Sequence, residues 1–295
     1  MGWHYNDLDV YVSAVSDVLN ETSYETENWF RVSQLGLIRS RPTITRSTNN
    51  AQKTTIPGKL GDQRSLVEQR SNAKIQIEIL VADAWPFASL KTSQNTMLQT
   101  VLNRALYLEQ VLNLAKRVAI KEQGHPTKEY YEVEDVAIEF NDADEKAAVL
   151  KCTMEVYPFV YDFASNTPIP IAAGASAVFH NELPYSECCP AYLINGSNGQ
   201  NKYINLSASR NNTVIHTASL HLKSNYPLTA SVMVDTKKMQ AYNYLNIATG
   251  GDADPMNKYL EGDYDQMRFP YNSTVTITNG TSDNIVVFMR KGLRI

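Results

Sequence analysis

The second half of this chain alternates between short runs of β-forming residues and clusters of Asn, Gly, Ser and Asp. After Val178, no stretch shows the three- and four-residue apolar spacing of a helix. Short strands at regular intervals are typical of antiparallel sandwiches and jelly rolls, because each turn returns the chain across a two-sheet core. We therefore expect a jelly-roll β-sandwich, with strands at 191–194, 202–206, 214–222, 230–234, 241–245, 274–278 and 285–289.

The chain is long enough to form two hydrophobic cores. Its 295 residues exceed the usual size of one domain, roughly 100–150 residues. The composition changes at 165–177, where Pro168, Pro170 and Gly174 stand among small residues. We place the domain boundary there, which gives an N-terminal extension at 1–28, a first domain at 29–165 and a second domain at 166–295.

The first domain is expected to be a β-sandwich-like domain with one packed α-helix. Residues 73–82 alternate between isoleucines and polar residues, which predicts a half-buried strand. Residues 93–116 repeat apolar side chains at helical spacing without Pro or Gly, which predicts a helix packed on a sheet. The apolar positions at 7–19 fit either a short helix or an arm. Further strands are expected at 117–121, 130–140 and 147–157, with turns at 124–126 and 141–144.

A basic segment precedes the first of these strands. Between Arg31 and Lys74 there are nine Lys or Arg residues, against only Asp62 and Glu68. Turn-forming residues stand among extended ones in the middle of this segment. One interpretation is a solvated loop, and the other is a projecting β-hairpin that packs on a neighbouring subunit. The residues of that hairpin contact would be Ile56, Pro57, Gly58, Lys59, Leu60 and Gly61.

Composition also limits the partners and the compartment. The formal net charge of −4, from 27 basic and 31 acidic residues, argues against specific nucleic-acid binding. No run of about 18 apolar residues would span a membrane, and the first residues lack the features of a signal peptide. We expect synthesis in a host cytoplasm. Cys152, Cys188 and Cys189 are too few and too closely placed for a disulfide framework, so free thiols are expected.

The sequence offers no motif on which a catalytic mechanism can be built. It has no Gly-x-Ser-x-Gly, Walker loop, dinucleotide fingerprint or His-Glu-x-x-His, so we expect neither an enzyme nor a cofactor. His216 and His221 stand five residues apart on one expected strand and would point to opposite faces. The acidic residues at 252–265 resemble a calcium loop, but Pro255 and Met256 stand where an EF-hand needs a ligand and a glycine. We interpret them as a surface loop without a metal.

Two other functions stay open. A carbohydrate-binding adhesin that contacts host cell-wall glycan could use the tyrosines of the second half, although core and strand-pair roles explain most tyrosines of a β domain. A glycan hydrolase could use Asp252, Asp254 or Glu261, provided that two carboxylates face each other across a cleft. The tyrosines are Tyr185, Tyr192, Tyr203, Tyr226, Tyr242, Tyr244, Tyr259, Tyr264 and Tyr271.

Three stretches, taken in order, resemble the distal tail protein (Dit) family of siphophage tail tips and baseplate hubs. The segments FRVSQLGL at 30–37 and TTIPGKLGD at 54–62 are similar to the opening strand and the Pro-Gly-x-x-Gly hairpin of the family. The segment CTMEVYPFVY at 152–161 resembles the strand that closes its first domain. The segments at 232–242 and 272–277 are similar to paired strands of its galectin-like jelly roll. Residues 1–28 have no counterpart in this pattern.

The resemblance implies a non-enzymatic protein of the virion tail tip. In such a protein the first domain forms a homohexameric ring that continues the tail tube, and the hairpin at Ile56–Gly61 reaches the adjacent subunit. The second, galectin-like domain faces outward and attaches the phage to its host through other proteins. The implied partners are a second copy of the chain, the tail tube protein, a tail-associated hub or fibre protein and receptor-binding proteins.

Overall fold

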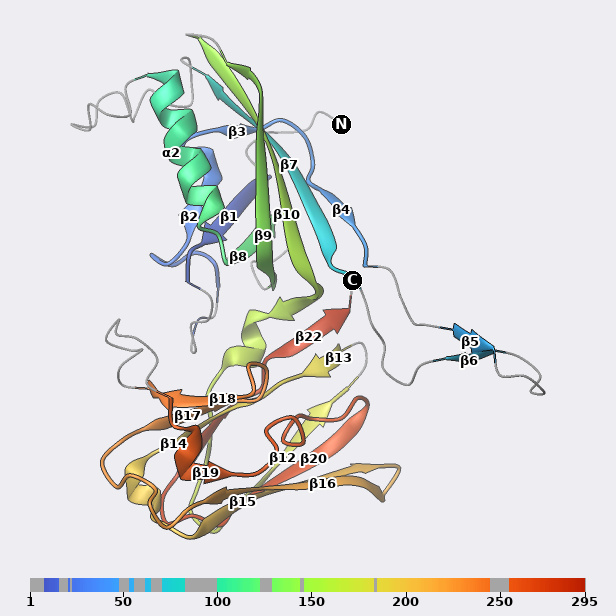
Figure 1. Cartoon of the computed structure of the whole chain (residues 1–295), viewed down its shortest axis with the longest axis vertical. Coiled ribbons are helices and arrows are strands. Elements are labelled where there is room, and N and C mark those ends of the chain that lie inside the picture. Colours follow the sequence, from blue (N-terminus) through green and yellow to red (C-terminus); the bar gives the residue numbers. More distant parts are fainter. Residues whose placement is uncertain are drawn as a thin grey trace. The chain divides into compact units, whose positions relative to one another are not determined.

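A computed structural model gives the arrangement of the chain in two compact units (Figure 1). It describes residues 8–15, 21, 23–47, 53–55, 62–64, 71–82, 100–122, 129–143, 146–182, 185–244 and 255–294. Apart from Glu21, the described residues up to Val160 form the first unit, and those from Tyr161 to Arg294 form the second. Strands dominate both units, which confirms the mainly β fold class.

One antiparallel sheet organises the first unit. Strand β7 pairs with β10, and from there the order runs β10-β9-β8-β1-β2, while β3 and β4 pair with the other edge of β7. The isoleucines of β7 are buried and the alternate residues are more exposed, as the sequence predicted. The strands are β1 (Asp9–Ser13), β2 (Phe30–Arg31), β3 (Leu37–Ile38), β4 (Thr43–Thr45), β7 (Ala73–Ala82), β8 (Arg117–Lys121), β9 (Glu129–Ala143) and β10 (Ala147–Asp162).

Helix α2 (Val101–Asn113) packs against β7 and β9 of this sheet. Val101, Ala105 and Leu108 are buried in the core that it shares with the isoleucines of β7. The predicted helix at 93–116 is wrong in its bounds, because Thr100 has an extended backbone and its side chain caps the first turn, accepting a hydrogen bond of 3.2 Å from the backbone N–H of Asn103. Residues 83–99 lie outside the described part. The predicted turn at 141–144 is also wrong, since β9 continues to Ala143.

The amphipathic stretch near the start of the chain forms strand β1, between β8 and β2. Its carboxylate Asp9 is buried and accepts hydrogen bonds from the side chains of Arg31 and Ser33 and from the backbone N–H of Ser33. The guanidinium of Arg117 on β8 is also buried and donates a hydrogen bond of 2.8 Å to the carbonyl of Val15. A buried charge is tolerated only when it is paired, so these contacts hold β1 in the sheet.

The second unit is a sandwich of two five-stranded antiparallel sheets, β11-β21-β14-β17-β18 and β12-β20-β15-β16-β19. The chain crosses between the two sheets several times, as in a jelly roll, although β15 and β16, and β17 and β18, are neighbours within one sheet. The strands of these sheets are β11 (Ile169–Ile171), β12 (Ser176–Asn181), β14 (Ala191–Ile194), β15 (Lys202–Arg210), β16 (Thr213–Leu222), β17 (Val232–Asp235), β18 (Gln240–Asn243), β19 (Leu260–Glu261), β20 (Ser273–Asn279) and β21 (Ile285–Phe288). Two further strands, β13 (Tyr185–Cys188) and β22 (Lys291–Arg294), pair with each other outside these two sheets.

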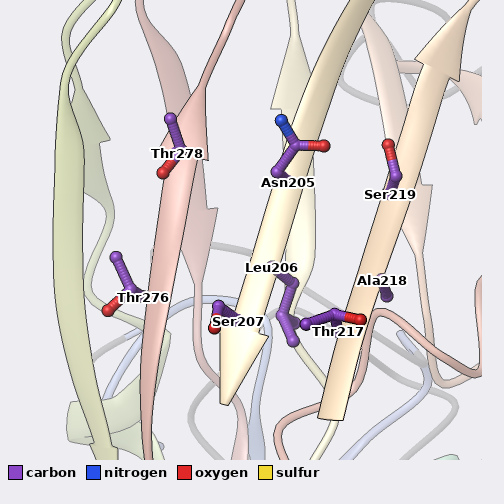
Figure 2. Close-up of a pocket in the computed structure, with 8 residues that line it drawn as sticks. All are labelled: Asn205, Leu206, Ser207, Thr217, Ala218, Ser219, Thr276 and Thr278. Atoms are coloured by element: carbon purple, nitrogen blue, oxygen red, sulfur yellow. The ribbon is translucent and has the colours of Figure 1, made fainter. Parts of the chain in front are cut away.

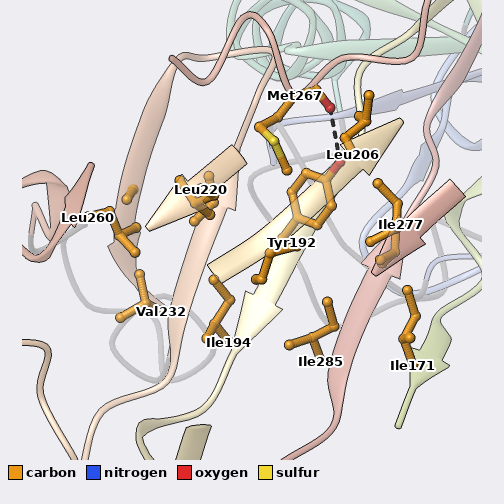
Figure 3. Close-up of a cluster of buried hydrophobic side chains, with 14 of the residues drawn as sticks. Ile171, Tyr192, Ile194, Leu206, Leu220, Val232, Leu260, Met267, Ile277 and Ile285 are labelled. Carbon is orange, nitrogen blue, oxygen red and sulfur yellow. Dashed lines mark hydrogen bonds between the residues drawn. The ribbon is translucent and has the colours of Figure 1, made fainter. Parts of the chain in front are cut away.

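The core between these sheets takes side chains from both of them (Figure 3). Leu206 and Leu220 come from one sheet, and Ile194 and Ile285 come from the other. Tyr192 is fully buried among them, and its hydroxyl donates a hydrogen bond of 2.9 Å to the carbonyl of Met267. Burial of the phenol raises the pKa of Tyr192 well above its usual value. The hydroxyl therefore serves as a neutral donor within the sandwich.

Candidate functional site

The basic segment forms a β-hairpin at the predicted place. Strands β5 (Lys53–Thr55) and β6 (Asp62–Arg64) pair in antiparallel register, with Lys53 opposite Arg64. They make a two-stranded sheet of their own, and among the described residues no other strand pairs with them (Figure 1). The six predicted contact residues, Ile56, Pro57, Gly58, Lys59, Leu60 and Gly61, lie between these strands and outside the described residues.

Strand β9 of the first unit carries a concentration of acidic residues. Glu129, Glu134, Asp135 and Glu139 are exposed along it. Glu134 accepts a hydrogen bond from the amide of Asn72. Within the described part of the chain, the carboxylates of Asp135 and Glu139 have no ion-pair partner. The strand thus presents uncompensated negative charge to its surroundings.

A groove of about 440 Å³ lies on the outer face of the second unit (Figure 2). Its floor is the sheet formed by β20, β15 and β16, and the buried side chain of Leu206 belongs to the core beneath it. Small polar side chains stand above the floor because they alternate with the buried apolar residues of each strand. The polar lining residues are Asn205, Ser207, Thr217, Ser219, Thr276 and Thr278.

Two stacked rings stand beyond one end of this groove. Tyr203 and His221 are cross-strand partners, two positions along from Asn205 and Ser219. Their ring centroids are 4.4 Å apart and their planes differ by 11°. The Nδ1 atom of His221 lies 3.5 Å from a carboxylate oxygen of Glu261 on β19. Tyr203 is 47% exposed, so much of its ring faces solvent.

Of the histidines and carboxylates considered from the sequence, His221 and Glu261 come into contact, but the described residues form no larger cluster. His216 pairs with Ala208 across the sheet and His221 pairs with Tyr203, so the two point to opposite faces as predicted. Glu261 is exposed, whereas Asp252 and Asp254 lie outside the described residues. Over the described ranges there is no group of three or more His, Cys, Asp or Glu residues that could hold a metal ion.

The groove was not predicted from the sequence. The signal was available in the alternation of short polar residues at 205, 207 and 209 and at 274, 276 and 278 with apolar residues between them. Alternation alone does not tell which strands become neighbours. The register brings Asn205 opposite both Thr278 and Ser219, and this pairing creates the groove.

The chain is similar in structure to several solved proteins, three of which are described here. The chain is similar to the SPP1 Dit protein, described as a paradigm of the hub adsorption apparatus in phages that infect Gram-positive bacteria, with 14% identity, a TM-score of 0.47, and 89% of this chain and 96% of that chain covered. It is also similar to chains of the phage P2 baseplate in its activated conformation, with calcium (8% identity, TM-score 0.46) and with strontium (6% identity, TM-score 0.47), each covering 98% of both chains. No family model and no curated protein matches.

Among the described residues, the structure contains no helix that is long and apolar enough to cross a membrane.

Proposed function

We propose that this chain is the structural hub of a phage tail tip, a homohexameric ring that continues the tail tube and anchors receptor-binding or baseplate proteins. The observation that carries this proposal is the separate hairpin formed by β5 and β6. Its strands lie on either side of Pro57 and Gly58 in the sequence, where the family resemblance puts an intersubunit arm. The order of the three resembling stretches along the chain is a second support.

The stability of the hairpin favours an external partner. Each of its strands has three residues, and a two-stranded ladder of this size is marginal in water without a surface to pack on. A partner surface would support this short ladder, and a negatively charged one would suit a segment rich in Lys and Arg.

Strand β9 supplies such a surface on a second copy of the chain. A ring with heterologous contacts needs two different complementary patches on every subunit. We assign one patch to the basic hairpin and the other to the exposed carboxylates of β9, among them Asp135 and Glu139. The two patches belong to the same unit, so each subunit can give its arm to one neighbour and receive the arm of the other.

The two units have separate roles in this proposal. The first unit forms the ring and contacts the tail tube protein on one side and a tail-associated hub or fibre protein on the other. The second unit faces outward and carries receptor-binding proteins. The protein then belongs to the tail tip of the virion after its synthesis in the host cytoplasm, and it acts as a structural protein rather than as an enzyme.

Light scattering on the purified chain, followed by negative-stain images of the same fraction, tests the proposal. We expect the mass of a hexamer and a six-fold ring with a central channel. The variant Lys53→Glu with Arg64→Glu should lose the ring, because it reverses the charge of the arm. Adding Asp135→Lys and Glu139→Lys to that variant should restore it.

Lys202→Glu is the matched control, since Lys202 is exposed and lies in the second unit. This change should leave the ring intact. A chain that stays monomeric at the highest soluble concentration would contradict assembly of the ring from this protein alone. A ring that survives the double charge reversal of the arm would remove the hairpin from the contact.

A further inference from the structure

We propose that the groove over β20, β15 and β16 is a binding site for a neutral oligosaccharide. This inference goes beyond the role of the chain as a hub, because it concerns the second unit alone and needs no ring. It rests on the geometry of the polar side chains, on their free hydrogen-bonding capacity and on the stacked rings beside them.

The polar side chains form two parallel rows across three strands (Figure 2). Thr278, Asn205 and Ser219 make one row, because Asn205 is in register with both of the others. In the same way Ser207 is in register with Thr276 and Thr217 and gives the second row. Neighbouring strands lie ~4.8 Å apart and alternate residues ~7 Å apart along a strand, so the six side chains form a grid of about 10 by 7 Å. A grid of this size can meet the hydroxyl groups of one or two sugar rings at once.

These groups are available to a ligand. Within the described part of the chain, the side chains of Asn205, Ser207, Thr217, Ser219 and Thr276 have no hydrogen-bond partner. Hydroxyl and amide groups both donate and accept hydrogen bonds, as sugar hydroxyls do. The lining can therefore donate hydrogen bonds to a sugar and accept them from it. Ser, Thr and Asn are short and lose little rotamer freedom when a ligand fixes them. The lining is therefore suited to a ligand rich in hydroxyl groups.

The stacked rings complete a sugar site at one end of the rows. A pyranose ring has one face of C–H groups, which prefers the apolar face of an aromatic ring to water. Tyr203 offers such a face, and His221 lies against its other side and holds the orientation of the phenol. The contact between His221 and Glu261 fixes the imidazole in turn. A saccharide can thus lay one ring on Tyr203 and extend its hydroxyls over Asn205 and Ser219.

Other occupants fit less well. None of the eight lining residues is charged, so the groove lacks the Lys and Arg side chains that phosphates require. The backbone of β15 is paired on both sides, with β16 and with β20, so a peptide cannot add here as another strand. The lining is too polar to receive an apolar helix, because Ala218 is its one apolar residue besides the buried Leu206. A neutral glycan matches this uncharged lining of hydroxyl and amide groups.

The test uses the full-length chain on an array of neutral oligosaccharides, built from hexoses, deoxyhexoses and N-acetylhexosamines, together with oligouronates of the same length. We expect binding to at least one neutral saccharide, with weaker or no binding to the uronates. Absence of binding to every neutral saccharide would overturn the proposal. Stronger binding to the uronates would equally overturn it, because the lining carries no positive charge.

Variants then place the site by calorimetry with the best neutral saccharide. Tyr203→Ala should weaken binding about five- to tenfold through loss of the stacking face. Asn205→Leu keeps the approximate size of the side chain and removes its donors and acceptors, with an expected loss of about tenfold. Tyr271→Ala is the matched control, since Tyr271 is also 47% exposed in the second unit and does not line the groove. Equal weakening by Tyr271→Ala, or unchanged binding in both groove variants, would refute the assignment.

Discussion

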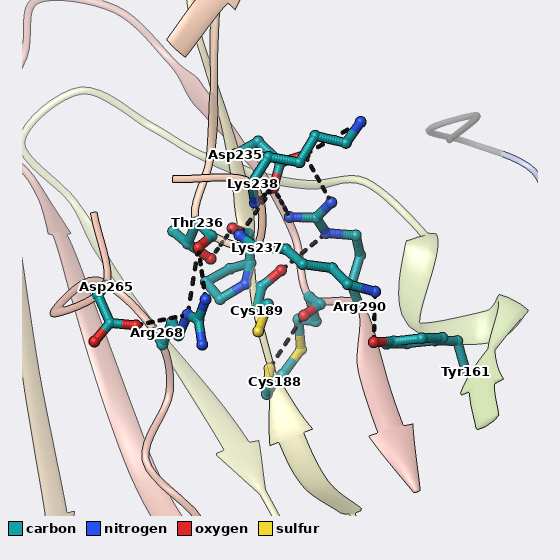
Figure 4. A network of polar contacts seen from close by, with 12 residues as sticks. Tyr161, Cys188, Cys189, Asp235, Thr236, Lys237, Lys238, Asp265, Arg268 and Arg290 are labelled. Carbon is teal, nitrogen blue, oxygen red and sulfur yellow. Dashed lines mark hydrogen bonds and ion pairs between the residues drawn. The ribbon is translucent and has the colours of Figure 1, made fainter. Parts of the chain in front are cut away.

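Arg290 and Asp235 form a buried two-pronged ion pair within the second unit (Figure 4). Two guanidinium nitrogens of Arg290 lie 3.0 and 2.6 Å from the two carboxylate oxygens of Asp235, and the exposed fractions of these side chains are 3% and 0%. The carboxylate also accepts hydrogen bonds from the backbone N–H groups of Lys237 and Lys238. A third guanidinium nitrogen of Arg290 donates to the carbonyl of Cys189. The pair thus joins the end of β17 to the segments before β14 and β22.

Removing one partner of this ion pair should strongly destabilise the second unit. Arg290→Met leaves the Asp235 carboxylate buried without its main counter-charge, and we expect a loss of about 3 kcal/mol in the free energy of unfolding, measured in urea. The double variant Asp235→Leu with Arg290→Met should lose less, because it leaves no unpaired buried charge. Asp265→Ala breaks the exposed pair with Arg268 and serves as the control, with an expected effect below about 1 kcal/mol. A cost for Arg290→Met no larger than that of the control would contradict the role of the pair.

The same carboxylate should make stability depend on acidity. Burial raises the pKa of Asp235, but the charge and hydrogen bonds of Arg290 outweigh this effect, and the pKa lies below its usual value of 3.8. A carboxyl group whose pKa is lowered on folding stabilises the fold above its unfolded pKa, and this stability is lost as the pH falls through the folded value. We expect the midpoint of urea unfolding to decrease below about pH 4 in the wild type. The double variant Asp235→Leu with Arg290→Met should show a smaller decrease over the same range.

Two glycines of the second unit should respond differently to alanine. A Cβ atom on Gly196 would lie 2.3 Å from the backbone carbon of Leu228, where neither chain segment can yield easily. Gly174 has a φ of +68° but no atom within 4 Å of its Cβ position, so Ala there meets only backbone strain. We expect a loss of about 1 kcal/mol for Gly174→Ala and a larger one, about 2–3 kcal/mol, for Gly196→Ala. Thermal unfolding of both variants measures these losses. A larger loss for Gly174→Ala than for Gly196→Ala would contradict the prediction.

The sequence predicted those elements whose side-chain pattern is local. Strands β7, β8 and β14 have the predicted bounds. Strand β7 shows the alternation of a half-buried strand, and β8 and β14 are short runs of mostly apolar residues, so each pattern is local to its own segment. Strand β1 could not be assigned, since its burial depends on Arg31 and Arg117, far away in the chain. The predicted start of α2 was wrong because apolar residues at helical spacing continue before Thr100, whereas the N-cap at Thr100 makes Val101 the first residue of the helix.

The two candidate sites differ in the same way: one has a local sequence pattern, and the other depends on contacts between distant strands. The hairpin was predictable because turn chemistry is local, and strands β5 and β6 enclose the predicted turn. The groove was not predictable, because its two polar rows exist only when β20, β15 and β16 pair in one register. A shift of one residue on β15 would turn Asn205 and Ser207 into the core and Leu206 to the surface. Side-chain chemistry could be read from the sequence, but the contact between distant strands could not.

The three cysteines should report on the unfolding of each unit separately. Cys152 lies in β10 of the first unit, and Cys188 and Cys189 lie in the second; all three are free and buried. Burial raises the pKa of Cys152 to about 12, and since the thiolate is the reactive form, the native thiol should resist iodoacetamide at pH 8. Mass spectrometry should find no labelled cysteine in the folded protein and three in urea.

In Arg290→Met, labelling of Cys188 and Cys189 in dilute urea should become faster than in the wild type, because that unit opens more often. Labelling of Cys152 should keep its wild-type rate if the first unit retains its own core. Rapid labelling of Cys152 in the native protein would contradict its burial. Equal acceleration at all three thiols would show that the two units unfold as one cooperative structure, in which the ion pair of Arg290 and Asp235 stabilises the whole chain.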